Sequence, residues 1–279
     1  MKVVVANNLG FCKGVEKALD TADEVCAKVE EGKKIYFYGE IVHNTLVTDN
    51  YKKMGAIMIT SPQEIEEPGI VIIRAHGISD RERRELEEGN NEIVDCTCPV
   101  VLKGQRLVRE SNLPVIILGY KGHSEVNSLS GSSNSGVKIV SMLSDLHDVS
   151  PGRYRGVVQT TFSIPLLNEL IEKGRKKGIE IELANTICRA SVVRRTCVEK
   201  LAGEVDAVVV VGAQHSANAR ELAETVERLG KPSYLVENED SIPSEVFSYD
   251  IIGLTAGAST PCGQYLKVKE RLENRQNGK

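Results

Sequence analysis

The segment VIILGYKGH, residues 115–123, is a short apolar run that ends in glycine and leads into a histidine. Two further segments have the same form, YFYGEIVH at residues 36–43 and VVVVGAQH at residues 208–215. A short continuous apolar run bounded by glycine is typical of a strand buried on both faces of a parallel sheet. The three segments therefore predict three buried strands, each followed by an imidazole.

A cysteine precedes each of these segments at a similar distance. Cys12, Cys98 and Cys188 lie 31, 25 and 27 residues before the three histidines, and successive cysteines are 86 and 90 residues apart. Each cysteine stands just before a helical pattern, and each unit contains a further strand that ends in small polar or imidazole residues. Those strand segments are VIIRAHGIS (71–79), VVQTTFS (157–163) and IIGLTAGAS (251–259). Three units in phase predict an internal threefold repeat.

Short apolar runs alternate with helical patterns along the chain, which predicts an α/β fold with mostly parallel sheets covered on both faces. We predict strands at residues 3–6, 35–38, 71–74, 115–119, 137–140, 156–158, 207–211 and 251–254, and helices at 15–29, 166–177, 194–201 and 221–229. The expected organisation is three similar α/β units at residues 1–95, 96–187 and 188–279, the last with a polar C-terminal tail. Ligands of open α/β sheets lie beyond the carboxyl ends of the strands, so we expect the cysteines and strand-end polar groups to share one centre.

The composition excludes several classes of protein. Of the 279 residues, 41% are hydrophobic and 27% are charged, which is typical of a folded domain and not of a disordered chain. The net charge is −4, only 4% of the residues are aromatic, and there is no tryptophan, so we expect no nucleic-acid platform. Neither a membrane-spanning run nor a secretion signal is recognisable, and we expect a cytoplasmic protein with reduced thiols.

Seven cysteines are an odd number, so they cannot all pair within one chain. The chain has no C-x-x-C pair, which argues against a zinc knuckle, whereas three widely spaced thiolates suit an iron–sulfur cluster bound through three irons. The fourth iron would be open to a substrate oxygen. A non-catalytic zinc or redox-sensing scaffold is the alternative from another class, and each single cysteine could also be a buried apolar residue.

The other four cysteines are outside this repeat. Cys26 lies on the apolar stripe of the first predicted helix, which favours a place in the core. Packing is the simplest interpretation of Cys197, inside a helical pattern, and Cys96 has no assigned role. Cys262 stands at a predicted helix start near the expected centre and is a candidate extra ligand or redox thiol.

Polar residues at the predicted strand ends suggest an anion site. Imidazoles, hydroxyls and an amide near helix N-termini are suited to a diphosphate; the candidates are His43, His76, His123, Ser216, Asn218 and Ser259. Glu125 follows His123 closely, and a carboxyl group at that place could transfer protons. Thr160 and Thr161 lie at the equivalent end of another strand and could relay a proton or bind a substrate hydroxyl.

Taken together, these motifs resemble the 4-hydroxy-3-methylbut-2-enyl diphosphate reductase family. The chain carries, in the family's order, GFCKGV (10–15), GEIVHN (39–44), IRAHGIS (73–79), TCPVV (97–101), GHSEV (122–126), QTTFS (159–163), TIC (186–188) and TAGAS (255–259). The resemblance implies a trefoil of three pseudo-equivalent α/β units around a central 4Fe–4S cluster with one open iron. It also implies a two-electron reductive dehydration, the last step of the non-mevalonate isoprenoid route, that yields isopentenyl and dimethylallyl diphosphates.

Carried over by position, Cys12, Cys98 and Cys188 would bind the cluster. The diphosphate would be held by His43, His76, His123, Ser216, Asn218 and Ser259, with Thr161 beside the substrate. Glu125 and Thr160 would form the proton path, and ferredoxin or flavodoxin would deliver the electrons one at a time.

The chain departs from the family pattern mainly in its third unit. The family usually reads Asn-Ser-Ser-Asn where this chain has His215-Ser216-Ala217-Asn218, and Tyr-Ala-Thr where it has Arg189-Ala190-Ser191. Arg195 replaces a usual glutamine, Cys96 replaces a usual alanine, and Cys262 is also unusual. These changes leave open a paralogue that reduces or desulfurises another small molecule.

Overall fold

The computed structural model describes residues 1–29 and 32–274, which leaves the last five residues of the predicted C-terminal tail outside the described part. The strands of that part are β1 (Lys2–Val5), β2 (Ile35–Tyr38), β3 (Ile57–Ile59), β4 (Ile70–Ile73), β5 (Glu92–Asp95), β6 (Val115–Leu118), β7 (Val137–Val140), β8 (Gly152–Val158), β9 (Ile179–Ala184), β10 (Ala207–Val211), β11 (Ser233–Val236) and β12 (Ile251–Ala256). They form three four-stranded sheets in which every pair is parallel. The predicted α/β class is therefore confirmed.

Helices connect these parallel strands. They are α1 (Lys13–Lys28), α2 (Thr45–Lys53), α3 (Asp80–Glu88), α4 (Pro99–Arg109), α5 (Ser124–Ser130), α6 (Ile164–Lys176), α7 (Arg189–Ala202), α8 (Ala217–Arg228) and α9 (Cys262–Glu273). The four predicted helices correspond to α1, α6, α7 and α8, although α7 begins five residues before its predicted start. Within the described residues, no helix has the length and apolarity needed to cross a membrane.

The predicted repeat appears in the order of the strands. The three sheets have the orders β3-β2-β4-β5, β7-β6-β8-β9 and β11-β10-β12-β1. One helix of each unit (α1, α4 or α7) begins directly after Cys12, Cys98 or Cys188, and the strand that follows this helix along the chain is second in the order of its sheet. The next two strands along the chain lie on either side of that strand. The third sheet takes its fourth strand, β1, from the other end of the sequence, so the same pattern is completed by a distant segment.

The chain divides into two compact bodies. The smaller body contains residues 1–16, residues 43–47 and the described residues from 189 on, and it holds the sheet with β1 and β12. The larger body contains residues 17–42 (those described) and 48–188, and it holds the other two sheets. The division into three contiguous units at residues 95/96 and 187/188 stays a prediction.

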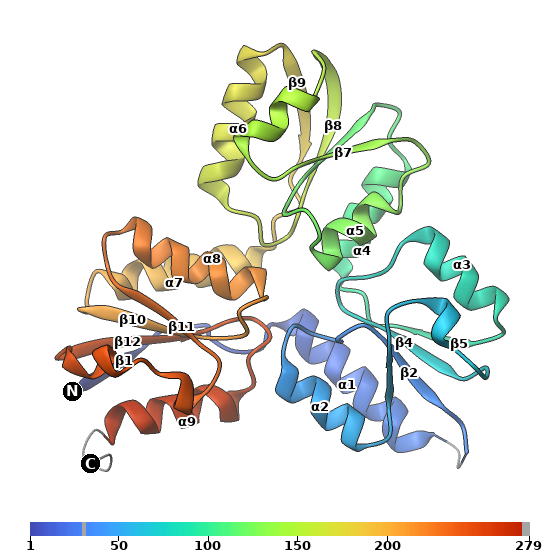
Figure 1. Ribbon diagram of the computed structural model, residues 1–279. Coiled ribbons are helices and arrows are strands. Elements are labelled where there is room, and N and C mark those ends of the chain that lie inside the picture. The colour runs from blue at the N-terminus through green and yellow to red at the C-terminus, as the bar shows by residue number, and fades with distance from the viewer. Residues whose placement is uncertain (30–31, 275–279) are drawn as a thin grey trace. The chain divides into compact units, whose positions relative to one another are not determined.

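In the smaller body, β10 is buried on both faces, as the valine run predicted. Val208 and Val210 pack in a cluster with side chains of α7 and α8, whereas Val209 and Val211 pack in a second cluster with side chains of α9. Successive side chains of a strand point to opposite faces, so one uninterrupted apolar run supplies both layers. Figure 1 shows α7 and α8 on one face of this sheet and α9 on the other.

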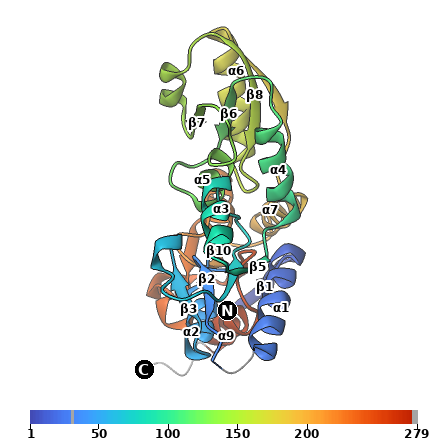
Figure 2. The same cartoon turned by 90° about the vertical axis from the view of Figure 1, so that its right-hand side faces the viewer.

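The larger body repeats this arrangement around β6. Ile116 and Leu118 belong to a cluster with side chains of α6, and Val115 and Ile117 belong to a cluster with residues of α4 and α5. Strands β6, β7 and β8 of this sheet are also visible in the turned view of Figure 2. Because both faces are covered, the polar groups of the connecting loops gather at the ends of the strands, where the candidate site residues lie.

Candidate functional site

Cys12, Cys98 and Cys188 occupy equivalent places in the repeat. Each is the last residue before a helix, namely α1, α4 or α7. Each backbone N–H donates a hydrogen bond to a carbonyl two residues beyond the end of β12, β4 or β8. These bonds run from Cys12 to Ala258 (3.2 Å), from Cys98 to Ala75 (2.9 Å) and from Cys188 to Thr160 (2.9 Å). The fold thus places each of the three thiols at the carboxyl edge of its own sheet.

The chemistry of these three thiols fits the iron–sulfur group that the sequence suggests. All three cysteines are half-buried, and none of the seven cysteines, which all lie in the described part of the chain, forms a disulfide. A ligand must reach the metal as a thiolate. Burial raises the pKa of Cys96 to about 11, with Asp95 adding to the effect, so this thiol is a poor ligand.

The remaining cysteines differ in their surroundings. Cys26 is half-buried and not fully in the core as predicted, and burial, with help from Asp23, raises the pKa of its thiol. Cys197 accepts a hydrogen bond from Asn8 Nδ2 at 3.6 Å. Cys262 is exposed and begins α9, as its sequence position predicted.

In the smaller body, the predicted anion-binding residues lie close to one another. Ser259 Oγ donates to the carbonyl oxygen of His43 at 3.0 Å, and Asn218 Oδ1 accepts from the backbone N–H of Ala258 at 2.9 Å. Ser216 caps α8 by accepting from Ala219 N at 3.4 Å. A capping hydroxyl accepts through a lone pair and keeps its hydrogen as a donor.

His215 adds an imidazole to this group. Its ring lies edge-on to that of His43, with the two centroids 5.2 Å apart. His43 is half-buried, whereas His215 is exposed. The smaller body therefore presents two adjacent imidazoles, and Ser259 is bonded to the backbone of one of the two residues.

In the larger body, His76 and His123 form a second imidazole pair. Their ring centroids are 5.5 Å apart and the rings are nearly perpendicular, at 85°. His76 follows β4, and His123 is the N-cap of α5, where its Nδ1 accepts from the backbone N–H of Glu125 at 3.1 Å. This bond identifies Nδ1 as the acceptor, so a neutral His123 carries its hydrogen on Nε2 and can donate it to an anion.

Glu125 is buried and held by one neighbour. Its two carboxylate oxygens accept hydrogen bonds from Thr160, one from the backbone N–H and one from Oγ1, both at 2.7 Å. The side chain is 2% exposed, and desolvation raises its pKa to about 7 although both Thr160 bonds act to lower it. A carboxyl group with this pKa exchanges protons near neutral pH.

Thr160 connects the carboxyl group of Glu125 with Cys188, a candidate cluster ligand. The carbonyl oxygen of Thr160 accepts the backbone N–H of Cys188, while its N–H and hydroxyl bind Glu125. Thr161 lies next to this link, and its Oγ1 accepts from Gln159 Nε2 at 3.1 Å. The structure thus joins Glu125, Thr160 and Cys188 directly, whereas Thr161 is tied to Gln159.

Two buried glutamines were missed in the sequence analysis. Gln159 is fully buried, and its Oε1 accepts from the backbone N–H of Tyr120 at 2.9 Å, which joins the ends of β6 and β8. Gln105 lies on α4 and bonds to Ile78 in the loop after β4 and to Ser128 of α5. A sequence signal for Gln105 was present, since it follows Cys98 by two helical turns and so lies on the same side of α4.

We predict that Glu125→Gln stabilises the protein at alkaline pH. The folded pKa lies above the ordinary value, so the folded state holds a proton that the unfolded state has lost between about pH 4.5 and 7, and stability falls as the pH rises through this window. Relative to wild type, the variant should gain up to about 3 kcal/mol at pH 8 and less than about 1 kcal/mol near pH 5. Urea unfolding at both pH values measures the difference.

Glu172→Gln, in an exposed ion pair with Lys176, is the control and should give the same small difference at both pH values. A gap between Glu125→Gln and wild type that stays constant from pH 5 to pH 8 would contradict the assignment of the raised pKa to Glu125.

The sequence matches the family model described as "LytB protein" over residues 3–273, almost the whole chain. The chain belongs to the LytB family. The resemblance of its motifs to 4-hydroxy-3-methylbut-2-enyl diphosphate reductases is thereby confirmed. LytB enzymes are oxidoreductases of the non-mevalonate isoprenoid pathway and typically carry a 4Fe–4S cluster.

Similar proteins of other organisms are named 4-hydroxy-3-methylbut-2-enyl diphosphate reductase. A 4-hydroxy-3-methylbut-2-enyl diphosphate reductase of Wolbachia pipientis wMel is 34% identical, over 94% of this chain and 88% of the relative. One of Alkaliphilus oremlandii is 35% identical, over 98% of this chain and the full length of the relative.

Two solved LytB-type structures are also similar. The E-1-hydroxy-2-methyl-but-2-enyl-4-diphosphate reductase of Plasmodium falciparum has a TM-score of 0.91 and 29% identity, and the match covers 98% of this chain and 88% of that one. A second structure, of (E)-4-hydroxy-3-methyl-but-2-enyl diphosphate reductase, has a TM-score of 0.69 and 30% identity, over 98% and 99% of the two chains. These likenesses place the three-sheet α/β architecture of this chain within the LytB family.

Proposed function

We propose that the protein is a 4-hydroxy-3-methylbut-2-enyl diphosphate reductase that converts this substrate to isopentenyl and dimethylallyl diphosphates. The observation that carries the proposal is the Thr160 link, which connects the buried carboxyl group of Glu125 with the backbone of Cys188. A proton donor is thus built into the same loop as a candidate cluster ligand. A reductive dehydration needs such a donor, because two protons are consumed with two electrons.

Cys12, Cys98 and Cys188 would hold a 4Fe–4S cluster through one thiolate each. When bound, the cluster supplies the two electrons singly and offers an open iron to the substrate hydroxyl. Support for this ligand set comes from the equivalent place of the three cysteines before α1, α4 and α7. The raised pKa values of Cys26 and Cys96 argue against those two thiols.

The diphosphate would be bound by imidazole, hydroxyl and amide donors. His123 can donate from Nε2, since its Nδ1 is occupied by the Glu125 N–H. We assign His43, His76, Thr161, Ser216, Asn218 and Ser259 to the same role. Charge-assisted hydrogen bonds of this kind bind phosphate oxygens strongly.

Glu125 and Thr160 would deliver the protons. In the overall reaction, the allylic C–O bond breaks and its oxygen leaves as water, while a C–H bond forms on the allylic carbon skeleton. One proton goes to the departing oxygen and one to carbon. Glu125 is suited to this task because its pKa of about 7 keeps a large share of it protonated at neutral pH.

The electrons would come from ferredoxin or flavodoxin, in a cytoplasmic setting where thiols stay reduced. The alternative is a LytB paralogue that reduces or desulfurises a different small molecule. The His215 ring beside His43 favours this alternative, because it changes the donors offered to the substrate. Arg189 and Ala217 also differ from the residues usual in the family, and they lie in the same smaller body.

Anaerobic turnover tests the proposal. Protein purified without oxygen is expected to be brown, to contain about four irons per chain, and to consume 4-hydroxy-3-methylbut-2-enyl diphosphate with dithionite and a viologen dye. Both isomeric products should appear. An iron-loaded protein that does not turn over this substrate would support the paralogue, and a colourless preparation that contains only zinc would contradict the cluster.

A further inference from the structure

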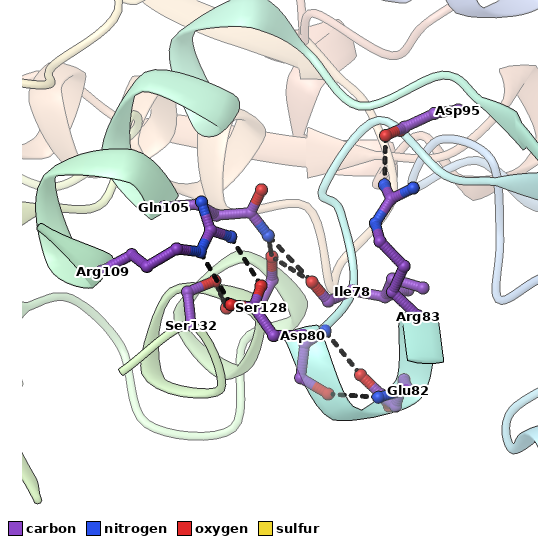
Figure 3. A network of polar contacts seen from close by, with 10 residues as sticks. Ile78, Asp80, Glu82, Arg83, Asp95, Gln105, Arg109, Ser128 and Ser132 are labelled. Carbon is purple, nitrogen blue, oxygen red and sulfur yellow. Dashed lines mark hydrogen bonds and ion pairs between the residues drawn. The ribbon is translucent and has the colours of Figure 1, made fainter. Parts of the chain in front are cut away.

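Gln105 of α4 lies at the junction of the two sheets of the larger body. Its Nε2 donates hydrogen bonds to the carbonyl oxygen of Ile78 at 2.8 Å and to Ser128 Oγ at 2.7 Å (Figure 3). A primary amide nitrogen carries two hydrogens, so these bonds use both. The Gln105 side chain is 6% exposed and Ser128 is 2% exposed. One buried amide therefore joins α4 to α5 and to the loop after β4.

Each of these three elements carries a candidate site residue. Cys98 directly precedes α4, seven residues before Gln105. His76 lies in the loop after β4, two residues before Ile78, and His123 is the N-cap of the helix that contains Ser128. The Gln105 amide thus connects the segments that carry one cysteine and two imidazoles.

The loop after β4 approaches α5 very closely. Gly77 has a φ of +72°, and a Cβ atom at this residue would lie 2.7 Å from Ser128 Oγ and 3.2 Å from Gln105 Nε2. No side chain fits at this place without moving the polar groups. The separation of the loop from α5 is therefore set by the Gln105 and Ser128 hydrogen bonds, with no side chain of residue 77 as a spacer.

We propose that Gln105 is a positioning residue that sets the separation of the His76 and His123 imidazoles. This inference rests on the proposed function, in which the two rings bind the diphosphate. The rings are 5.5 Å apart in the structure, and Gln105 bonds to the backbone carbonyl of Ile78 in the segment of His76 and to the side-chain hydroxyl of Ser128 in the helix that His123 caps. Displacements of about 1 Å in a binding group can change rates and affinities by up to a hundredfold.

The structure also supplies a matched control on the same helix. Arg109 of α4 pairs with Asp80 at the start of α3, through Nη2 at 2.6 Å and Nε at 2.8 Å. These side chains are 42% and 27% exposed. The pair joins α4 to the start of α3, two residues beyond Ile78, through side chains that are far more exposed than that of Gln105 (Figure 3).

Gln105→Met tests the proposal, because it keeps the length of the side chain and removes both donors. With anaerobic, cluster-loaded protein and inorganic diphosphate as the titrant, calorimetry should give about tenfold weaker binding for Gln105→Met. Arg109→Met should stay within about twofold of wild type. Equal losses in the two variants, or unchanged binding in folded Gln105→Met, would overturn the proposal.

A second variant covers the case in which Gln105→Met does not fold. Ser128→Ala removes the acceptor of one Gln105 bond and the longer Ser128 Oγ bond to the Ile78 carbonyl at 3.4 Å, and it keeps the bond from Gln105 to Ile78, so it should weaken diphosphate binding about threefold. Unchanged binding in Ser128→Ala would then count against the proposal.

Crystal structures of the variants separate this inference from the proposed function. Gln105→Met, or Ser128→Ala in its place, should change the distance between the His76 and His123 rings, and Arg109→Met should not. If wild type fails to bind diphosphate while the ring distance still changes in the variant, the proposed function fails and the positioning role stands. An unchanged ring distance overturns the positioning role, whatever wild type binds.

Discussion

Glu125→Gln should lower kcat by a factor of at least about 100. The variant keeps the size of the side chain and an oxygen that can accept the Thr160 N–H, but it has no exchangeable acid proton. Wild-type turnover should also fall as the pH rises above about 7, because the protonated form of Glu125 is lost there. Anaerobic initial rates between pH 6 and 9 measure both effects.

The binding of inorganic diphosphate separates proton transfer from structural damage. Glu125→Gln should leave the Kd for this anion within about twofold of wild type, and its iron content should not change. The exposed variant Glu172→Gln serves as the control and should keep both kcat and the pH profile. A Glu125→Gln enzyme with an unaltered kcat would remove Glu125 from the mechanism.

Cys188→Ser should abolish turnover and most of the bound iron. A serine hydroxyl is far less acidic than a thiol and is a poor ligand for iron in such clusters, which prefer thiolates. Because the Cys188 N–H bonds to the Thr160 carbonyl through the backbone, the loop itself should keep its conformation. Iron analysis and the brown absorption of the anaerobically purified variant measure the loss, and kcat should fall by about 1000-fold or more.

Cys26→Ser is the matched control for this experiment. Cys26 is also half-buried, but it lies within α1 and has a raised pKa. This variant should keep about four irons per chain. Full iron content in Cys188→Ser, or equal loss in both variants, would contradict the proposed ligand set.

The sequence was informative about strands that are buried on both faces. Residues 35–38 and 207–211 were predicted with the bounds of β2 and β10, because an uninterrupted apolar run has few other interpretations. The strands β3, β5, β9 and β11 were missed. All four lie at the edges of their sheets, and β5 and β9 carry charged residues such as Glu92 and Glu182 that interrupt the apolar pattern.

The candidate site was predicted best where it depends on the repeat. The repeat predicted a helical segment soon after each of Cys12, Cys98 and Cys188, and α1, α4 and α7 begin directly after these cysteines, α7 five residues before its predicted start. The Thr160–Glu125 bonds join residues that are 35 positions apart, and a spacing of that size carries no periodic signal. The spacing of Gln105 from Cys98 placed it on the same side of α4, but its partners Ile78 and Ser128 are 27 and 23 positions away, so its hydrogen bonds could not be predicted.

The place of β1 beside β12 has a consequence for how the chain folds. Lys2 pairs with Ile251, so the contact spans nearly the whole described chain, whereas the strands of the other two sheets pair within much shorter stretches. Closing so long a loop costs more entropy, and contacts between distant residues form slowly. During synthesis, the larger body can complete its sheets while β1 still waits for β12 to leave the ribosome. Until then both edges of β1 lack a partner strand, whereas in the folded sheet one edge pairs with β12, so this segment is exposed to pairing with other chains for longer than the strands of the larger body.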